Sequence, residues 1–157
     1  MMTRPHEDRG EAWVAAQLGI FALAAAAPCW EGPWPPALQR LGRAVGLPFV
    51  LVGAALLSAG SRQLGRNLTP LPRPKADTVL VEDGIYGAVR HPLYSGIIFL
   101  LFGSALASGR LARLAVALAA VGFFDAKARR EEAWLIERFP EYAGYRRRVR
   151  KFIPGLY

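Results

Sequence analysis

The stretch PLYSGIIFLLFGSALASG at residues 92–109 decides the fold class of this chain. Its 18 residues carry no charge, and their number is close to the roughly 20 that an α-helix needs to cross the hydrocarbon core of a bilayer. Charge-free runs of similar length lie at residues 12–30 and 44–61. These three runs predict membrane-spanning helices.

A fourth apolar run occupies residues 111–124. Arg110 and Arg113 at its start can extend their charged ends to the membrane surface while their stems stay in the apolar layer, and Asp125 closes the run. We therefore predict an all-α integral membrane bundle of about four transmembrane helices, forming one domain over residues 1–157. A soluble bundle is the alternative, but so many apolar helices would leave this short chain almost no amphipathic surface.

The basic residues predict the orientation of the bundle. With the N-terminus inside, 16 of the 20 lysines and arginines fall in cytoplasmic segments and 4 in outside loops, as the positive-inside rule expects. This distribution explains the net charge of +8 without nucleic-acid binding and predicts cytoplasmic N- and C-termini. The basic cluster at residues 146–151 is expected to contact anionic membrane lipids. The Ala- and Arg-rich composition suggests a bacterial inner membrane.

The first apolar run and the potential metal ligands exclude some other interpretations. Acidic residues precede that run and no clear small-residue cleavage site follows it, which favours a retained helix over a signal peptide. Cys29 is the single cysteine, and the two histidines, His6 and His91, are far apart. We therefore expect neither a disulfide nor a metal site.

The first candidate site segment, GIYGAVRHPLYSG at residues 84–96, meets the membrane at the start of the third predicted span. Pro92 is tolerated there because the first turn of a helix needs no donor from its N1 residue. His91 and Tyr94 lie three residues apart and share a helix face, with Arg90 just outside. Gly96 leaves room for a ligand or for a neighbouring backbone.

The second segment, residues 125–154, begins with a predicted amphipathic cytoplasmic helix that ends before Pro140. Glu132 falls on an otherwise apolar stripe of this helix, where a carboxylate is costly unless a cation neutralises it. Glu131 lies four residues after Lys127, and an ordinary surface ion pair explains it. Glu132 is therefore the acid that the pattern singles out.

Together the two segments resemble the isoprenylcysteine carboxyl methyltransferase family and the related phospholipid N-methyltransferases. The resemblance rests on residues 84–96 and on EEAWL at 131–135, followed by FPEYAGY at 139–145 and FIP at 152–154. It covers roughly residues 64–154, and the first two apolar runs match only in being apolar.

The resemblance implies methyl transfer from S-adenosyl-L-methionine to a lipid-like or isoprenylated acceptor, a carboxylate, at the cytoplasmic face. Its cofactor pocket would be lined by Tyr86, His91, Leu93, Tyr94, Gly96, Glu131 and Glu132. Arg90 would orient the carboxylate through a two-pronged contact. Glu132 would accept a proton if the acceptor were an amine. Asn67 and Trp134 are expected to bind substrate at the lipid-side entrance.

Three alternatives remain open at this point. A phospholipid amine N-methyltransferase shares the same segments. A NADPH-dependent membrane reductase of the sterol-reductase type shares similar Arg-His-Pro and Tyr elements, although those chains are generally longer. A non-catalytic membrane scaffold would have been indicated by the loss of pocket residues, and the set is intact. The glycine-rich turn of soluble methyltransferases is absent from the sequence.

Overall fold

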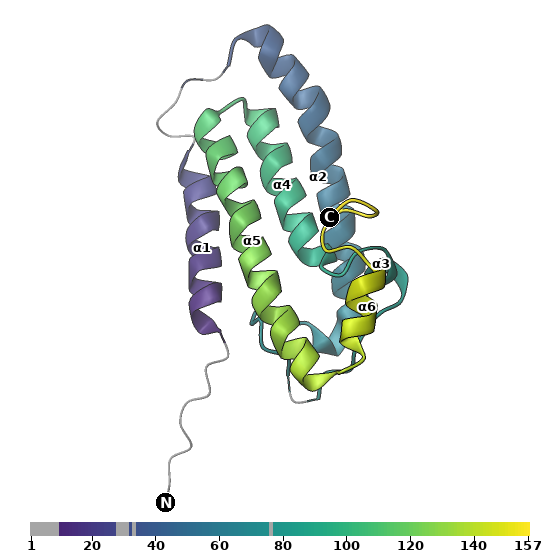
Figure 1. Ribbon diagram of the computed structural model, residues 1–157. Coiled ribbons are helices and arrows are strands. Elements are labelled where there is room, and N and C mark those ends of the chain that lie inside the picture. Colours follow the sequence, from purple (N-terminus) through teal and green to yellow (C-terminus); the bar gives the residue numbers. More distant parts are fainter. Residues whose placement is uncertain (1–9, 28–31, 33, 76) are drawn as a thin grey trace, which may run out of the picture.

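The computed structural model describes residues 10–27, 32, 34–75 and 77–157, and the regular structure in these ranges is helical (Figure 1). Its elements are α1 (Glu11–Ala26), α2 (Pro36–Leu64), the 3-10 turn η2 (Gly65–Asn67), α3 (Gly84–Ala88), α4 (Pro92–Ser108), α5 (Leu111–Arg138) and α6 (Tyr142–Arg148). Within the described ranges, extended pairing is limited to one bridge between Val89 and Arg150. The all-α prediction is confirmed.

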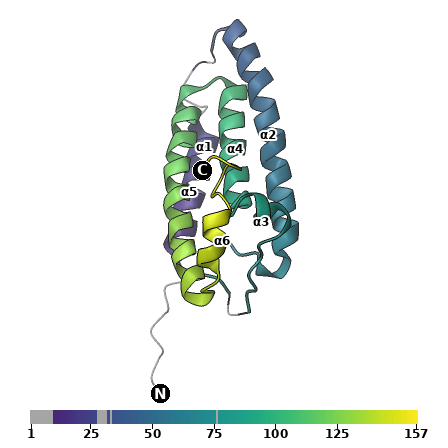
Figure 2. The ribbon, with the colours of Figure 1, turned by 45° about the vertical axis from the view of Figure 1, so that its right-hand side comes forward.

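The four long helices lie side by side in the order α1, α5, α4, α2, and the short helices α3 and α6 cover one end (Figures 1 and 2). The polypeptide of residues 68–81, which we call the strap, joins η2 to α3 at that same end. Helix α1 packs on α5, where the rings of Trp13 and Phe123 are 5.6 Å apart between centroids. Arg113, expected to reach the membrane surface, donates from Nε to the carbonyl of Ala24 near the end of α1 at 3.2 Å.

Glycines bring α2 and α4 into close contact. Gly42, Gly46, Gly53 and Gly60 are the buried residues of α2. A Cβ atom built on Gly53 would lie 2.7 Å from the carbonyl oxygen of Gly96, and one on Gly46 would lie 2.5 Å from that of Gly103. Backbones can approach this closely only where side chains are absent. Gly96 therefore serves the contact with α2, one of the two possibilities that the sequence left open.

The helix bounds refine the predicted spans. Helix α4 coincides with the run at 92–109, because Pro92 begins it and Gly109 ends it in the left-handed conformation, with φ 63°. Helix α2 begins at Pro36 rather than at residue 44, and it passes through Pro48 without interruption. Of the described helices, the one over 36–67 is long and apolar enough to cross a membrane by itself, while α1 and α4 are shorter apolar helices. Residues 28–30 of the first predicted span lie outside the described ranges.

Helix α5 joins the fourth predicted span and the predicted cytoplasmic helix without a break. Its first half buries small and aromatic side chains, including Ala120 and Phe124, in the core of the bundle. Its second half buries Lys127 and Glu132 instead. One rigid helix thus carries the charged residues of the second segment directly to the end of the bundle.

Candidate functional site

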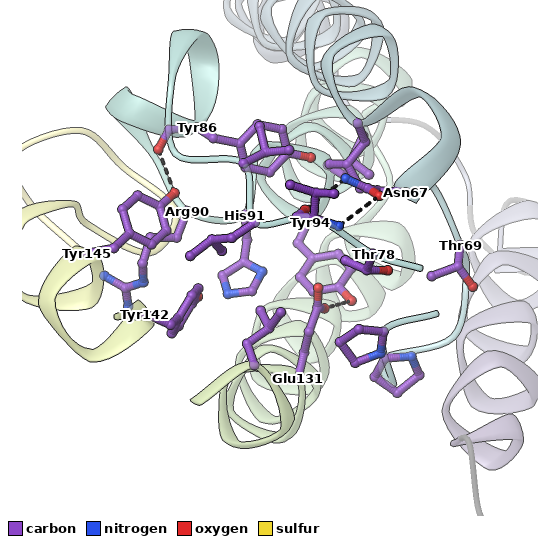
Figure 3. Close-up of a pocket in the computed structure, with 18 of the residues that line it drawn as sticks. Asn67, Thr69, Thr78, Tyr86, Arg90, His91, Tyr94, Glu131, Tyr142 and Tyr145 are labelled. Carbon is purple, nitrogen blue, oxygen red and sulfur yellow. Dashed lines mark hydrogen bonds between the residues drawn. The ribbon is translucent and has the colours of Figure 1, made fainter. Parts of the chain in front are cut away.

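A pocket opens at the capped end of the bundle, between the strap, α3, α6 and the ends of the long helices (Figure 3). It encloses about 790 Å³ of space, which includes open solvent at its mouth. Lining side chains come from both candidate segments and from the strap, among them Asn67, Leu71, Pro72, Pro74, Thr78, Tyr86, Arg90, His91, Leu93, Tyr94, Glu131, Leu135, Tyr142 and Tyr145.

Main-chain hydrogen bonds hold the two candidate segments together. The amide of Arg90 donates to the carbonyl of Arg150 at 2.9 Å, and the amide of His91 donates to that of Lys151 at 3.1 Å. The hydroxyl of Ser95 donates to the carbonyl of Phe152 at 2.9 Å. These bonds hold the start of α4 against the C-terminal segment, which comprises residues 143–157.

Glu132 lies behind the pocket wall at the centre of a buried ion cluster. Its Oε1 accepts hydrogen bonds from Arg90 Nε and from His91 Nε2, each at 3.0 Å, and its Oε2 lies 3.3 Å from Arg146 Nε. Burial alone would raise the pKa of Glu132, but the hydrogen bond and charge of His91, together with Arg90, lower it to about 2. The cations that the apolar stripe required are thus present.

These facts correct the role expected for Glu132. The side chain is 1% exposed and does not line the pocket. A carboxylate with a pKa of about 2 is also a weak proton acceptor at neutral pH. Glu132 therefore organises Arg90 and His91 and is unsuited to take a proton from a substrate in the pocket.

Glu131, the neighbouring acid, lines the pocket. Its Oε2 accepts a hydrogen bond from the hydroxyl of Tyr94 at 2.5 Å, as Figure 3 shows. The expected surface ion pair with Lys127 is wrong, because Lys127 is 1% exposed and donates to Gln17 and to the carbonyl of Pro70. The acid that the pattern assigned to an ordinary surface is the one that faces the cavity.

Aromatic rings form one side of the pocket. The His91 and Tyr94 rings stack at 5.3 Å with an interplanar angle of 5°, and Tyr142 meets Tyr145 edge to face at 5.4 Å. Burial raises the pKa of Tyr86, of Tyr142 and of Tyr145, so these phenols stay neutral. The Tyr145 hydroxyl donates to the carbonyl of Tyr86 at 2.6 Å, which joins α6 to α3 (Figure 3).

Arg90 lines the pocket, but most of its guanidinium is engaged within the protein. Nε binds Glu132, and Nη1 donates to the carbonyl of Arg146 at 3.1 Å and to that of Val149. A two-pronged contact with a substrate carboxylate needs two adjacent nitrogens. In this conformation Arg90 acts as a cross-link between the start of α4 and the C-terminal segment.

The remaining predicted residues separate into two groups. Asn67 lines the pocket. Its side-chain nitrogen donates to the carbonyl of Val79 at 2.9 Å, and its side-chain oxygen accepts from the main-chain amide of Val79 at 3.3 Å, so the two ends of the strap are joined. Trp134 stacks under the guanidinium of Arg130, which is 4.3 Å from the ring centroid, and Trp134, like Gly96, is outside the pocket lining. The sequence thus located Tyr86, Arg90, His91, Leu93, Tyr94, Glu131 and Asn67 at the pocket.

Sequence reasoning missed the strap side chains and the two tyrosines of α6 as parts of the pocket wall. Three prolines, Pro70, Pro72 and Pro74, mark the strap as an ordered non-helical segment, but nothing in the pattern shows which of its side chains turn inward. Tyr142 and Tyr145 belong to the FPEYAGY motif, and their spacing of three residues on one helix face was the available signal.

The fold and the site define a class: a bundle of largely apolar helices with a pocket at one end. The sequence model of the phospholipid methyltransferase family matches residues 41–142, and the chain belongs to this family. The family resemblance of its two segments is thereby confirmed.

Two curated proteins are similar in sequence to most of this chain. The chain is 34% identical over 112 residues to the protein-S-isoprenylcysteine O-methyltransferase of Schizosaccharomyces pombe, covering 69% of this chain and 48% of that protein. It is 32% identical over 129 residues to the cobalt-zinc-cadmium resistance protein CzcN of Cupriavidus metallidurans, covering 81% and 54%. The chain spans about half the length of these curated relatives.

A solved structure has the same fold over nearly the whole chain. The eukaryotic intramembrane Ras methyltransferase, an isoprenylcysteine carboxyl methyltransferase, superposes with a TM-score of 0.68 at 25% sequence identity. The match covers 98% of this chain and 55% of the other. Helix α1 and the C-terminal segment, which lie outside the region matched by the family, are thus part of the shared fold.

Proposed function

We propose that this chain transfers a methyl group from S-adenosyl-L-methionine to a lipid-like acceptor, an isoprenylated carboxylate, at the cytoplasmic face of a membrane. One observation carries the proposal. The two segments that resemble the family meet in one pocket, where Glu131 faces the cavity and Glu132 fixes Arg90 and His91 from behind.

The proposed orientation places four spans, α1, α2, α4 and the first half of α5, in the bilayer and both termini in the cytoplasm. Large apolar side chains such as Leu41, Leu51 and Leu118 are exposed on these helices, as lipid contact requires. The pocket end instead carries the exposed arginines of α6. A bacterial inner membrane, suggested by composition, is part of the same proposal.

The residues of the pocket fit the proposed cofactor. S-adenosyl-L-methionine supplies an electrophilic methyl group on a positively charged sulfur. Glu131 offers a carboxylate to its cationic groups, while the His91 and Tyr94 rings and the apolar strap residues offer surfaces for adenosine. Leu93 and Leu135 extend the apolar wall.

Methyl transfer is an in-line displacement, so the protein mainly has to align the acceptor and exclude water. A carboxylate acceptor is ionised at neutral pH and needs no base. Arg90 contributes positive charge at the wall, and Glu132 holds that charge in place. An amine acceptor would have to lose a proton, and Glu131 faces the cavity where such a proton would be released.

Ligand binding by paired glutamine variants tests the cofactor assignment. We expect wild type to bind S-adenosylhomocysteine and not NADPH in calorimetry of the detergent-solubilised protein. Glu131→Gln should weaken that binding about tenfold without loss of thermal stability, because it removes a charged contact from the cavity wall. Glu132→Gln should lower both stability and binding. NADPH binding, or no binding of either ligand by folded protein, would overturn the proposal.

The class of acceptor needs a separate experiment, because the names of the family and of a relative indicate different acceptors. The family is named for phospholipid methyltransferases, whereas the Schizosaccharomyces pombe relative is a protein-S-isoprenylcysteine O-methyltransferase. Labelled methyl transfer from S-adenosyl-L-methionine can be compared on a prenylated cysteine carboxylate and on phosphatidylethanolamine in the same vesicles. We expect label on the carboxylate as a base-labile ester. Label only on the amine would establish the N-methyltransferase alternative.

A further inference from the structure

Lys127 is a buried charge that the proposed reaction does not use. It lies on α5, one turn before Glu131, and does not line the pocket. Its ammonium donates to Gln17 Oε1 at 2.6 Å and to the carbonyl of Pro70 at 3.0 Å. The same ammonium lies 5.4 Å from the centroid of the Tyr94 ring. One side chain thus contacts α1, the strap and the aromatic wall of the pocket.

Burying this charge is unfavourable. The hydrogen-bond partners of Lys127 are two neutral oxygens, and the ion pairs found among the described residues do not include it. Burial lowers the pKa of Lys127, and the negative charge of Glu131 opposes that shift. A methionine of similar length would avoid the desolvation of an ammonium group. A costly buried charge beside a pocket points to a role in that pocket.

The strap explains why a donor is needed at this position. Its prolines lack N–H groups, so the strap cannot form a regular hydrogen-bond ladder and its carbonyls depend on donors from elsewhere. Lys127 supplies the donor for Pro70, and the side-chain amide of Asn67 donates to the carbonyl of Val79 at 2.9 Å. The residues immediately after Pro70, Leu71 and Pro72, form part of the pocket wall.

We propose that Lys127 is a positioning residue for the ligand pocket, holding the strap against α1 and α5 and supporting the Tyr94–Glu131 pair from behind. The inference rests on the proposed function, because the pocket it shapes is the one assigned to the cofactor. Gln17 then belongs to the same arrangement. Helix α1 influences ligand binding through Gln17 although none of its residues lines the pocket.

The test compares four variants of the full-length protein in detergent. Lys127→Met removes the ammonium, Gln17→Leu removes its acceptor on α1, and Gln17→Glu keeps an acceptor oxygen. Arg129→Met removes an exposed charge from the same helix as a matched control. Calorimetry gives the dissociation constant for S-adenosylhomocysteine, and hydrogen exchange followed by mass spectrometry reports on the amides of Thr69, Leu71 and Arg73.

Lys127→Met should raise the dissociation constant about tenfold and Gln17→Leu about threefold, because each loosens the wall by removing hydrogen bonds of a charged donor. Strap amides should exchange faster in both variants, while Gln17→Glu and Arg129→Met behave as wild type. The melting temperature of Lys127→Met without ligand should stay close to that of wild type, because removing a buried charge offsets the loss of its two hydrogen bonds. In turnover, the KM for the methyl donor should rise more than kcat falls.

The outcomes separate the inference from the proposed function. Unchanged affinity and unchanged strap exchange in Lys127→Met would overturn the inference while wild-type binding keeps the cofactor assignment. If wild type does not bind S-adenosylhomocysteine, the proposed function fails, and strap exchange alone then decides whether Lys127 anchors the strap. Should Lys127→Met fail to fold, the Gln17→Leu and Gln17→Glu pair carries the test, and equal affinities in that pair would contradict the inference.

Discussion

The α2–α4 interface and the cluster around Glu132 hold the protein together in opposite ways. At the interface, glycines such as Gly53 and Gly96 let two apolar helices touch through their backbones. In the cluster, Glu132 is held by Arg90 and His91 through polar contacts between segments far apart in the sequence. The interface requires that side-chain atoms are absent at the glycines, whereas the cluster requires that Glu132 and its cationic partners are all present.

The largest effect is expected from adding a side chain at the interface. Gly53→Leu should prevent recovery of folded protein, because even a Cβ atom would lie 2.7 Å from the carbonyl oxygen of Gly96, and the rest of the leucine side chain would extend further into this backbone contact. Size-exclusion profile and melting temperature in detergent measure the outcome.

Gly122→Ala on α5 is the matched control for that substitution. A Cβ atom at Gly122 has no neighbour within 4 Å, and alanine is the better helix former by about 1 kcal/mol. The control should therefore melt at or above the wild-type temperature. A Gly53→Leu protein as stable as wild type would show that the two helices do not depend on close backbone contact.

Removing one member of the buried cluster should have the next largest effect. Glu132→Gln leaves Arg90 buried without its carboxylate, and breaking a buried ion pair from one side costs about 3–5 kcal/mol. The double variant Arg90→Met, Glu132→Leu should lose much less than the sum of the two single changes, as a coupled pair requires. Additive losses in thermal unfolding would mean that the two side chains act independently.

The sequence predicted the interface helices better than it predicted the cluster. Pro92 and Gly109 mark both ends of α4, because each is a local signal. The start of α2 was missed because Arg40 and Arg43 interrupted the charge-free run, although arginines in the first turns of a span can reach the membrane surface.

The sequence predicted which residues form the candidate site better than it predicted the role of each residue. Helical periodicity gives the face on which Glu131 or Glu132 lies, but it does not give what that face meets. Glu132 was correctly expected to need a cation, and its assignment as a proton acceptor does not fit its position behind the pocket wall. Lys127 carried no local signal, since its partners Gln17 and Pro70 come from distant parts of the chain.

Acid should weaken the cluster and leave the interface intact. The pKa of Glu132 is about 2 in the folded protein, below its ordinary 4.5. The folded state is therefore favoured by ionisation above pH 4.5, and this contribution, about 3 kcal/mol at most, is lost as pH falls through about 2. Melting temperatures can be measured from about pH 6 to about pH 2 in steps of about one pH unit. They should fall steeply for wild type and less for Glu132→Gln.

Tyr145→Phe should produce the smallest change and sharpens the contrast further. The Tyr145 hydroxyl donates to the carbonyl of Tyr86 at 2.6 Å, and both residues line the pocket. Losing this neutral hydrogen bond should lower stability by about 1 kcal/mol, because the ring keeps its packing and only the carbonyl loses its donor. Tyr157→Phe, which removes a hydroxyl bonded to Asp125 in an exposed setting, is the control and should cost less. If Tyr145→Phe lowers stability as much as Glu132→Gln does, the end of the bundle covered by α3 and α6 depends on neutral hydrogen bonds as strongly as on its buried charges.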